Sequence, residues 1–188
     1  MLDYEIVVDH GETPNKCTVM PLVYRTDFDI RQGRVTRALR ADLLLHPEGE
    51  PLSQLSLAPE KVTCLAAIDC IWRRLTPILA GIDAPHPPLA SIPRGFVTAY
   101  PRTSKKDFDP EGGLATIEAI FIAAAFLGHW DLSLLREYFF AERFLALNSA
   151  VFESYGIQGP VEGPVFQPLL PRNSRTRRIG RGRQADSR

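Results

Sequence analysis

The sequence contains few cysteines, no cysteine pair and no apolar run long enough to span a membrane. Cys17, Cys64 and Cys70 are its three cysteines, and no Cys-x-x-Cys pair occurs. This pattern favours neither a disulfide framework nor a zinc site, and it fits a reducing cytosol. The longest apolar block, 114–127, is shorter than a bilayer span and contains Glu118. The first residues lack the basic and apolar regions of a signal peptide. We therefore expect a cytoplasmic protein with no membrane segment.

The chain also lacks net charge, but its charges are unevenly distributed. Residues 172–188 hold seven arginines and one acid, Asp186, which leaves 15 basic and 21 acidic groups in the other 171 residues. A basic arm on an acidic body favours a polyanionic partner for the arm. The alternative is a disordered tail that only keeps the chain soluble.

In residues 1–101, apolar runs alternate with helical or loop segments, which is typical of a mostly parallel α/β sheet. The sequence predicts strands at 4–8, 42–45, 65–69 and 96–100, with the second one stopped by His46-Pro47. It predicts a helix over 71–80 that Pro77 kinks, a helical turn opened by Pro59, and a proline-rich linker over 81–93. The basic segment 29–40, broken by Gly33, is either a short helix or an exposed arm.

The composition changes after Pro101. Residues 114–127 predict a buried helix that ends at Gly128. Asp131 predicts the N-cap of a second, amphipathic helix that runs to about Tyr155. We therefore expect an α/β domain in 1–101, a small all-helical domain with a Pro/Gly-rich end in 102–171, and a disordered arginine-rich tail in 172–188.

The stretch 65–72 carries the first candidate site. A buried strand ends in the carboxylate Asp69, and the indole Trp72 follows three residues later. Ligands of open α/β sheets bind outside the carboxyl ends of the strands, so this pair is suited to a small molecule with a planar base. The alternative is a solvated acid beside a core tryptophan. The four histidines show no metal-ligand spacing, so no metal site is expected.

Four patches, taken in order, resemble a known family, the small-subunit (16S/18S) rRNA aminocarboxypropyltransferases of ribosome biogenesis. They are Lys-Cys-Thr at 16–18, Ile-Asp-Cys-Ile-Trp at 68–72, the Ile-Pro…Phe-Val-Thr-Ala-Tyr-Pro segment at 92–101, and 114–148, which ends in Phe-Leu-Ala-Leu-Asn. The sequence departs from the family at 100–105, where the family has Asn-Pro-x-Asn-Tyr-Gly, and at 141–142, where it has Trp-Gly.

The resemblance implies a SPOUT-like fold, in which a knotted, mostly parallel sheet domain precedes a small helical domain. It implies S-adenosylmethionine as co-substrate. The 3-amino-3-carboxypropyl group would be transferred to a uracil-type base of small-subunit rRNA, free or in a pre-ribosomal particle, with release of methylthioadenosine. A monomer is expected. Two alternatives stay open: a SPOUT-type RNA methyltransferase, and a ribosome-assembly factor that has kept the fold without the chemistry.

The resemblance also implies roles for individual residues. Leu45, Pro47 and Trp72 would form the apolar slot for adenine, and the backbone of Phe96 would contact the ribose. The hydroxyls of Thr18 and Thr116 would hold the cofactor carboxylate. Asp69 would lie near the amino group or the sulfonium, and it is also the candidate for removing the imide proton of the base. Each of these side chains has a structural alternative, in the core or at a helix cap. Glu118 is expected to be a paired structural carboxylate.

Basic residues provide the candidate RNA contacts. Arg102, Lys105 and Lys106 lie on the loop expected to flank the mouth of the cofactor site, and Arg177 and Arg178 lie in the basic arm. Such an arm supplies phosphate contacts that do not depend on sequence and weaken with salt.

Overall fold

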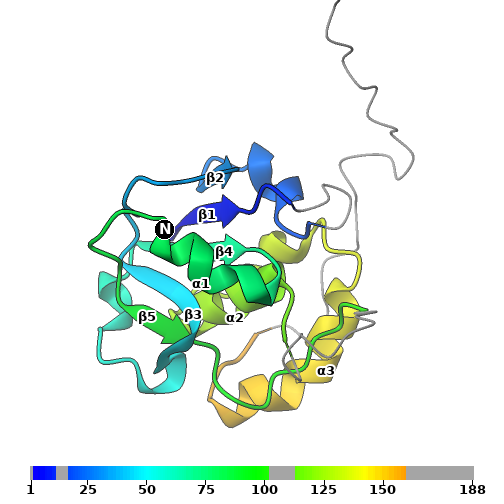
Figure 1. The fold of residues 1–188 in the computed structure, drawn as a ribbon. Coiled ribbons are helices and arrows are strands. Elements are labelled where there is room, and N and C mark those ends of the chain that lie inside the picture. The colour runs from blue at the N-terminus through cyan, green and yellow to red at the C-terminus, as the bar shows by residue number, and fades with distance from the viewer. Residues whose placement is uncertain (1, 12–16, 102–112, 160–188) are drawn as a thin grey trace, which may run out of the picture.

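A single parallel sheet forms the centre of the molecule (Figure 1). The computed structural model describes residues 2–11, 17–101 and 113–159. The strand order is β2-β1-β4-β3-β5, and every neighbouring pair is parallel. The strands are β1 (Asp3–Val8), β2 (Phe28–Gln32), β3 (Leu43–Pro51), β4 (Cys64–Asp69) and β5 (Leu89–Ser91). The mostly parallel α/β sheet predicted from the sequence is confirmed, and all strands end at the same edge.

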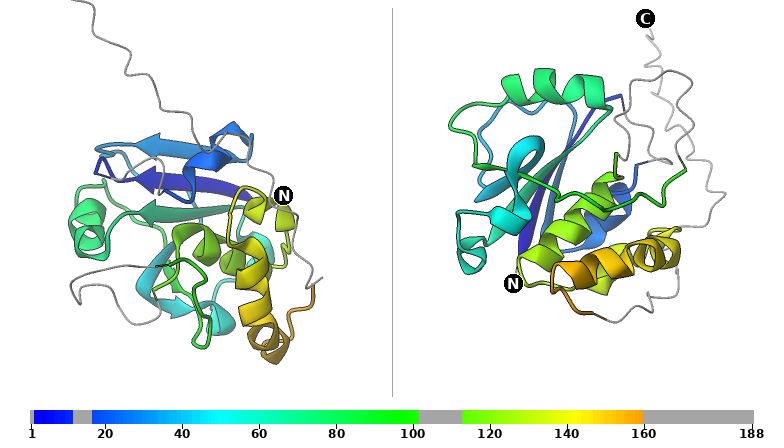
Figure 2. Two further views of the ribbon diagram at one scale, coloured as in Figure 1. Left: turned by 90° about the vertical axis from the view of Figure 1, so that its right-hand side faces the viewer. Right: turned by 90° about the horizontal axis from the view of Figure 1, so that it is seen from below.

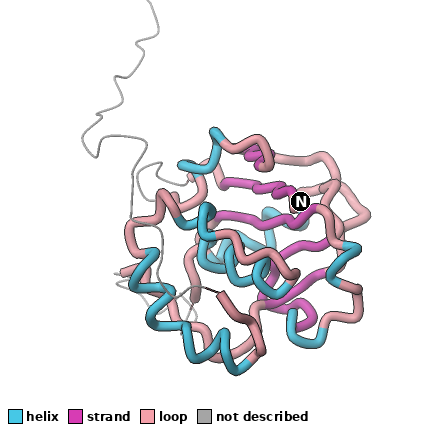
Figure 3. Tube along the Cα trace, turned by 180° about the vertical axis from the view of Figure 1, so that it is seen from behind, coloured by secondary structure: helices cyan, strands magenta, loops and turns pink. Residues whose placement is uncertain are grey.

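Helices cover both faces of the sheet (Figure 2, right). Helix α1 (Trp72–Ala80) lies on one face, and α2 (Thr116–Phe126) and α3 (Ala141–Ser154) lie on the other. Figure 3 shows the molecule from the side opposite to Figure 1. Because strand side chains alternate between faces, neighbouring residues enter different clusters. Ile6 and Leu65 pack in the large cluster with α2, whereas Val7 and Ala66 pack in the smaller cluster under α1.

Short 3-10 helices complete the described fold. They are η1 (Met20–Tyr24), η2 (Leu52–Gln54), η3 (Pro59–Lys61) and η4 (Leu132–Leu135). The predicted turn at Pro59 and the helix containing Pro77 are both confirmed, as η3 and α1. The helix expected over 114–127 is also confirmed: eight residues of α2 are buried, because it lies between the sheet and α3 rather than at the surface.

Four expectations about the sheet were wrong. Residues 96–100 form no strand, and the supposed linker 81–93 contains edge strand β5. Strand β3 does not stop at His46-Pro47, because a register shift between Leu45 and Glu50 lets it continue along β5 to Pro51. Segment 29–40 is neither a helix nor a simple arm, since its first residues form β2 and the rest is an irregular crossover to β3.

The single helix expected from Asp131 to about Tyr155 was also wrong. Asp131 does cap a helix, because its carboxylate accepts a hydrogen bond from the Ser133 amide at 2.9 Å. That helix is only η4, and the chain turns at 136–140 before α3 begins. The turn places the Tyr138 hydroxyl on the buried Glu118 carboxylate at 2.7 Å. The hydrogen bond between Tyr138 and Glu118 therefore stabilises a turn at 136–140 in place of a continuous helix. The glycine after α2, Gly128, has a φ of +86°, as its predicted stop requires.

The predicted division into domains stays a prediction, because its boundary at 101–102 and its tail at 172–188 involve residues outside the described ranges. Residues of α2 and α3 pack in the same apolar cluster as the strands. Within the described ranges, every helix is too short or too polar to cross a bilayer.

Candidate functional site

A cleft of about 1380 Å³ opens at the carboxyl ends of the strands. Its walls come from the residues after β1, β3 from Leu45 onward with η2, the β4–α1 junction, the segment 91–101, the start of α2 and Tyr155 after α3. The structure brings together in this cleft all seven residues predicted to bind the cofactor, which are Thr18, Leu45, Pro47, Asp69, Trp72, Phe96 and Thr116. They converge because Leu45 and Pro47 lie on β3 just past its pairing with β4, Asp69 ends β4, and the others lie on segments at the same edge of the sheet.

Asp69 lies at the base of the cleft and is held from both sides. The thiol of Cys17 donates to its Oδ2 atom at 2.8 Å, and the hydroxyl of Thr116 donates to its Oδ1 atom at 2.5 Å. The carboxylate is buried and joins three elements, the loop after β1, the end of β4 and the start of α2. Burial, with the charge and hydrogen bond of Asp69, raises the pKa of the Cys17 thiol to about 12. Cys17 is therefore a protonated donor at neutral pH.

The two threonines in the cleft differ in what they can still offer a ligand. Thr116 has one hydroxyl proton, and it is engaged with Asp69. A ligand can use only the lone pairs of Thr116 while that bond is kept. Thr18 accepts a long hydrogen bond, 3.4 Å, from the Ile117 amide, and this leaves its own proton available to donate. Of the two hydroxyls, that of Thr18 is better placed to donate to an anionic group.

Leu45, Pro47 and Trp72 form the apolar part of the lining. Pro47 is exposed and Trp72 is half-buried, packed against the cluster under α1. Gly49 fixes the position of this wall, because a Cβ there would lie 2.4 Å from the backbone nitrogen of Ala90. Only glycine lets β3 approach β5 so closely.

Segment 96–101 forms the opposite wall and is fixed by two buried side chains. Asn148 on α3 accepts from the Val97 amide at 2.8 Å and donates to the Val97 carbonyl at 2.9 Å. Glu118 on α2 accepts from the Ala99 amide at 2.8 Å and from the Thr98 hydroxyl at 2.7 Å. These bonds replace the strand pairing that the sequence predicted for this segment.

Sequence reasoning missed the roles of Cys17, Asn148 and Tyr155 in this cleft. Tyr155 stacks on Phe96 with ring centroids 6.1 Å apart and donates its hydroxyl to the Arg94 carbonyl at 3.1 Å. The signals were present for two of the three, since Cys17 and Asn148 belong to motifs of the resemblance. The expectation for Glu118 is confirmed, because it is a fully buried carboxylate with four hydrogen-bond donors around it.

The predicted RNA contacts Arg102, Lys105, Lys106, Arg177 and Arg178 all lie outside the described residues. Pro101 and Gly113, which flank the first three in the sequence, both line the cleft. Among the described residues, no group of His, Cys, Asp and Glu side chains could hold a metal ion.

The fold and the site define a class: a parallel α/β protein with helices packed on both faces of the sheet and a ligand-sized cleft at the strand ends. Neither a protein-family model nor a curated protein sequence matches the chain. Among solved structures, the chain is similar to the SAM-dependent rRNA:acp-transferase Tsr3 from Vulcanisaeta distributa. The TM-score is 0.55 at 21% sequence identity, over 82% of this chain and 83% of that chain. The resemblance stated from the sequence motifs is therefore confirmed at the level of the fold.

Proposed function

We propose that this protein is a transferase that uses S-adenosylmethionine to modify ribosomal RNA. The observation that carries the proposal is that the seven residues to which the family resemblance assigned the cofactor all line one cleft. Their positions span residues 18–116, and the fold brings them to the same edge of the sheet. The fold shared with an enzyme described as a SAM-dependent rRNA:acp-transferase supports the same conclusion.

The chemistry of the lining fits this co-substrate. Pro47 and the Trp72 indole offer flat apolar surfaces for adenine, and an aromatic–base contact contributes about 1–3 kcal/mol. The Thr18 hydroxyl has a proton free to donate to the carboxylate of S-adenosylmethionine. This hydroxyl lies next to the amino end of α2, where the helix carries partial positive charge. Asp69 presents negative charge to the ammonium or sulfonium group. Its fixed oxygens make it a pre-formed partner rather than a flexible one.

The finer proposal concerns which carbon is transferred. Bound S-adenosylmethionine supplies three electrophilic carbons on one sulfonium, and we propose that the 3-amino-3-carboxypropyl chain moves to a ring nitrogen of a uracil-type base. A nitrogen–carbon bond forms, a carbon–sulfur bond breaks, the imide proton leaves the base, and methylthioadenosine is released. Only positioning can favour this carbon over the methyl group, and positioning contributes up to about 7–11 kcal/mol. The two clamped walls of the cleft supply that rigidity.

The proposal includes the remaining expectations from the sequence. The target is small-subunit rRNA or a pre-ribosomal particle, contacted by Arg102, Lys105 and Lys106 and, in the basic arm, by Arg177 and Arg178. The protein acts as a monomer in the cytoplasm, with a knotted sheet domain ahead of a helical one. An experimental structure would show whether the chain passes through its own loop.

Binding tests the cofactor site directly. Calorimetric titration with S-adenosylmethionine should show a loss of affinity of about tenfold or more for Trp72→Ala, as expected for one aromatic–base contact. Tyr24→Ala removes an aromatic ring that is 67% exposed and outside the cleft lining, and it serves as the matched control. Equal affinity in wild type and Trp72→Ala would remove Trp72 from the site.

Product analysis tests the reaction. Methylthioadenosine indicates chain transfer, whereas S-adenosylhomocysteine indicates a methyltransferase. If rRNA from cells with and without the gene carries the same modifications, the protein is an assembly factor that has kept the fold without the chemistry.

A further inference from the structure

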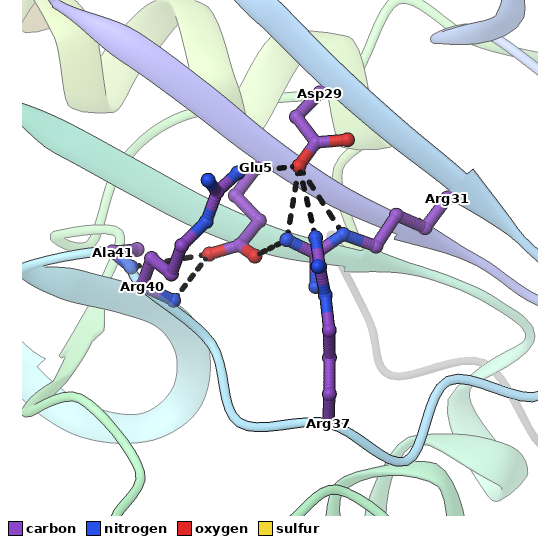
Figure 4. A network of polar contacts seen from close by, with 6 residues as sticks. All are labelled: Glu5, Asp29, Arg31, Arg37, Arg40 and Ala41. Carbon is purple, nitrogen blue, oxygen red and sulfur yellow. Dashed lines mark hydrogen bonds and ion pairs between the residues drawn. The ribbon is translucent and has the colours of Figure 1, made fainter.

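The crossover from β2 to β3, residues 33–42, is anchored to the sheet by a buried carboxylate (Figure 4). Glu5 points from the middle of β1 and is only 1% exposed. Its Oε2 atom accepts hydrogen bonds from the backbone amides of Arg40 at 2.7 Å and Ala41 at 3.1 Å. Its Oε1 atom forms an ion pair with Arg31. A charged group buried in a sheet requires such partners, and here they fix the path of the crossover.

The anchored crossover presents arginines at every third position. Val35 and Leu39 turn inward and pack in the cluster under α1, whereas Arg34, Arg37 and Arg40 are exposed. We call these three residues the arginine ridge. The side chains of Arg37 and Arg40 remain 61% and 69% exposed, so they are accessible to a partner.

One carboxylate, that of Asp29, is the partner of three of the arginines on this surface. The Oδ2 atom of Asp29 lies 2.9 Å from Arg31, 2.7 Å from Arg40 and 3.6 Å from Arg37 (Figure 4). The hydrogen bond from Arg31 and the nearby guanidinium groups lower the pKa of Asp29. Within the described residues, Arg34 has no carboxylate partner. Three arginines, Arg31, Arg37 and Arg40, thus share the two acids Glu5 and Asp29. Asp42, which accepts from Thr63, and Asp83, whose amide donates to the Thr36 carbonyl, also lie beside the crossover. Arg34 adds a positive charge on the exposed side.

The crossover that carries the ridge starts beside the cleft. Gln32, the last residue of β2, is in register with Val8, which is in register with Asp69. Two strand spacings place Gln32 roughly 10 Å from Asp69. At the other end, the Asp42 amide donates to the carbonyl of Cys64, the first residue of β4. The crossover therefore runs the length of β4, about 17 Å for five strand steps, away from the cleft.

We propose that the arginine ridge binds the phosphate backbone of an RNA whose modified base occupies the cleft, an inference that rests on the proposed function. Arginine suits this role, because its guanidinium forms paired hydrogen bonds with phosphate and stays charged at any physiological pH. The anchoring by Glu5 means that the ridge is already formed before RNA arrives, so little conformational entropy is lost on binding. The Asp29 contacts give way to phosphate, since exposed ion pairs contribute little by themselves.

The test is the salt dependence of RNA binding by the full chain. A short fluorescein-labelled RNA hairpin is titrated over a salt series with wild type and with R34Q/R37Q/R40Q, which keeps the polar stems but removes three charges. The control R136Q/R143Q removes two exposed basic charges from the other face of the sheet, beside α3. Each lost phosphate contact lowers the slope of log affinity against log salt by about 0.7–0.9, so we expect the ridge variant to lose roughly 2–3. Affinity at about 0.1 M salt should fall on the order of 100-fold.

The outcomes separate this inference from the proposed function. A ridge variant with the wild-type slope and affinity overturns the inference, and a protein partner then becomes the better explanation of the ridge. The same preparations are titrated with S-adenosylmethionine, which does not touch the ridge, and unchanged cofactor binding shows that the variant is folded. If the triple variant fails to fold, the single change R34Q, at the arginine without a carboxylate partner, must lower the slope by about 0.7–0.9. Wild type that binds RNA with the expected slope but consumes no S-adenosylmethionine contradicts only the proposed function.

Discussion

Replacing Glu118 with glutamine tests the hydrogen bonds that hold the cleft wall. The carboxylate is fully buried and accepts four hydrogen bonds, two at each oxygen. Ala99 and Tyr138 donate to Oε1 at 2.8 and 2.7 Å, and Thr98 and Ala115 donate to Oε2 at 2.7 and 2.8 Å. Glutamine has the same shape, but one of its two terminal atoms is a donor.

The magnitude follows from which donors can adapt. A hydroxyl can rotate and accept from the new amide, so Thr98 or Tyr138 can adjust. A backbone amide cannot, and therefore the N–H of Ala99 or of Ala115 is left buried without an acceptor. One such group costs about 1–3 kcal/mol, and the loss of charge weakens the bonds that remain. We expect Glu118→Gln to lower the free energy of unfolding by roughly 2–4 kcal/mol.

Denaturant unfolding followed by circular dichroism measures this change. Glu142→Gln, at an exposed position in the first turn of α3, is the control and should change stability by less than about 0.5 kcal/mol. The variant should also bind S-adenosylmethionine more weakly, because Tyr100 and Pro101 follow the segment that Glu118 holds and line the cleft. A loss below about 1 kcal/mol would refute the assignment of Glu118 as the clamp of this wall.

Three further predictions follow from the same structure. The pKa of the Cys17 thiol is raised from 9.0 to about 12, so the folded state holds this proton more tightly than the unfolded chain, and the free energy of unfolding falls as the pH rises through that interval. Cys17→Ala should reduce this fall, measured by denaturation at a series of pH values. An unchanged fall would contradict the raised pKa of Cys17. Gly49→Ala should destabilise the protein by about 1–3 kcal/mol in thermal unfolding, whereas Gly81→Ala, with its nearest neighbour at 3.4 Å, should not. Deleting residues 172–188 should lower the slope of log RNA affinity against log salt concentration and leave cofactor binding, measured by calorimetry, unchanged. An unchanged slope would show that the tail does not contribute to RNA binding.

The parts of the fold that are determined by local apolar pattern were predictable from the sequence. β1, β4 and α2 are mostly apolar segments with one or two polar residues each, and they are buried in one layered core, so their burial is visible in the residues themselves. β2 and β5 are short edge strands with partly exposed side chains, and their pairing comes from neighbouring strands rather than from their own composition.

Tertiary hydrogen bonds explain the errors. Segment 96–100 reads as a strand, but Glu118 and Asn148 satisfy its backbone instead of a neighbouring strand. The break before α3 has no glycine or proline to signal it, and it is held by the contact between Tyr138 and Glu118. Partners distant in sequence decide both cases, and a single sequence does not reveal them.

The cleft lining was predictable for a different reason. Candidate residues that follow strand ends in a parallel sheet must meet at one edge, so the position of Asp69 and Trp72 after a strand was informative. How Asp69 is held was not predictable, because the contributions of Cys17 and Thr116 come from segments 52 and 47 residues away.

The most direct test of the central claim is to incubate the protein with S-adenosylmethionine and rRNA from cells lacking its gene, and to identify both products by mass spectrometry. The proposed reaction predicts methylthioadenosine together with a nucleoside that carries a 3-amino-3-carboxypropyl group. Release of S-adenosylhomocysteine, or no consumption of S-adenosylmethionine, would contradict it.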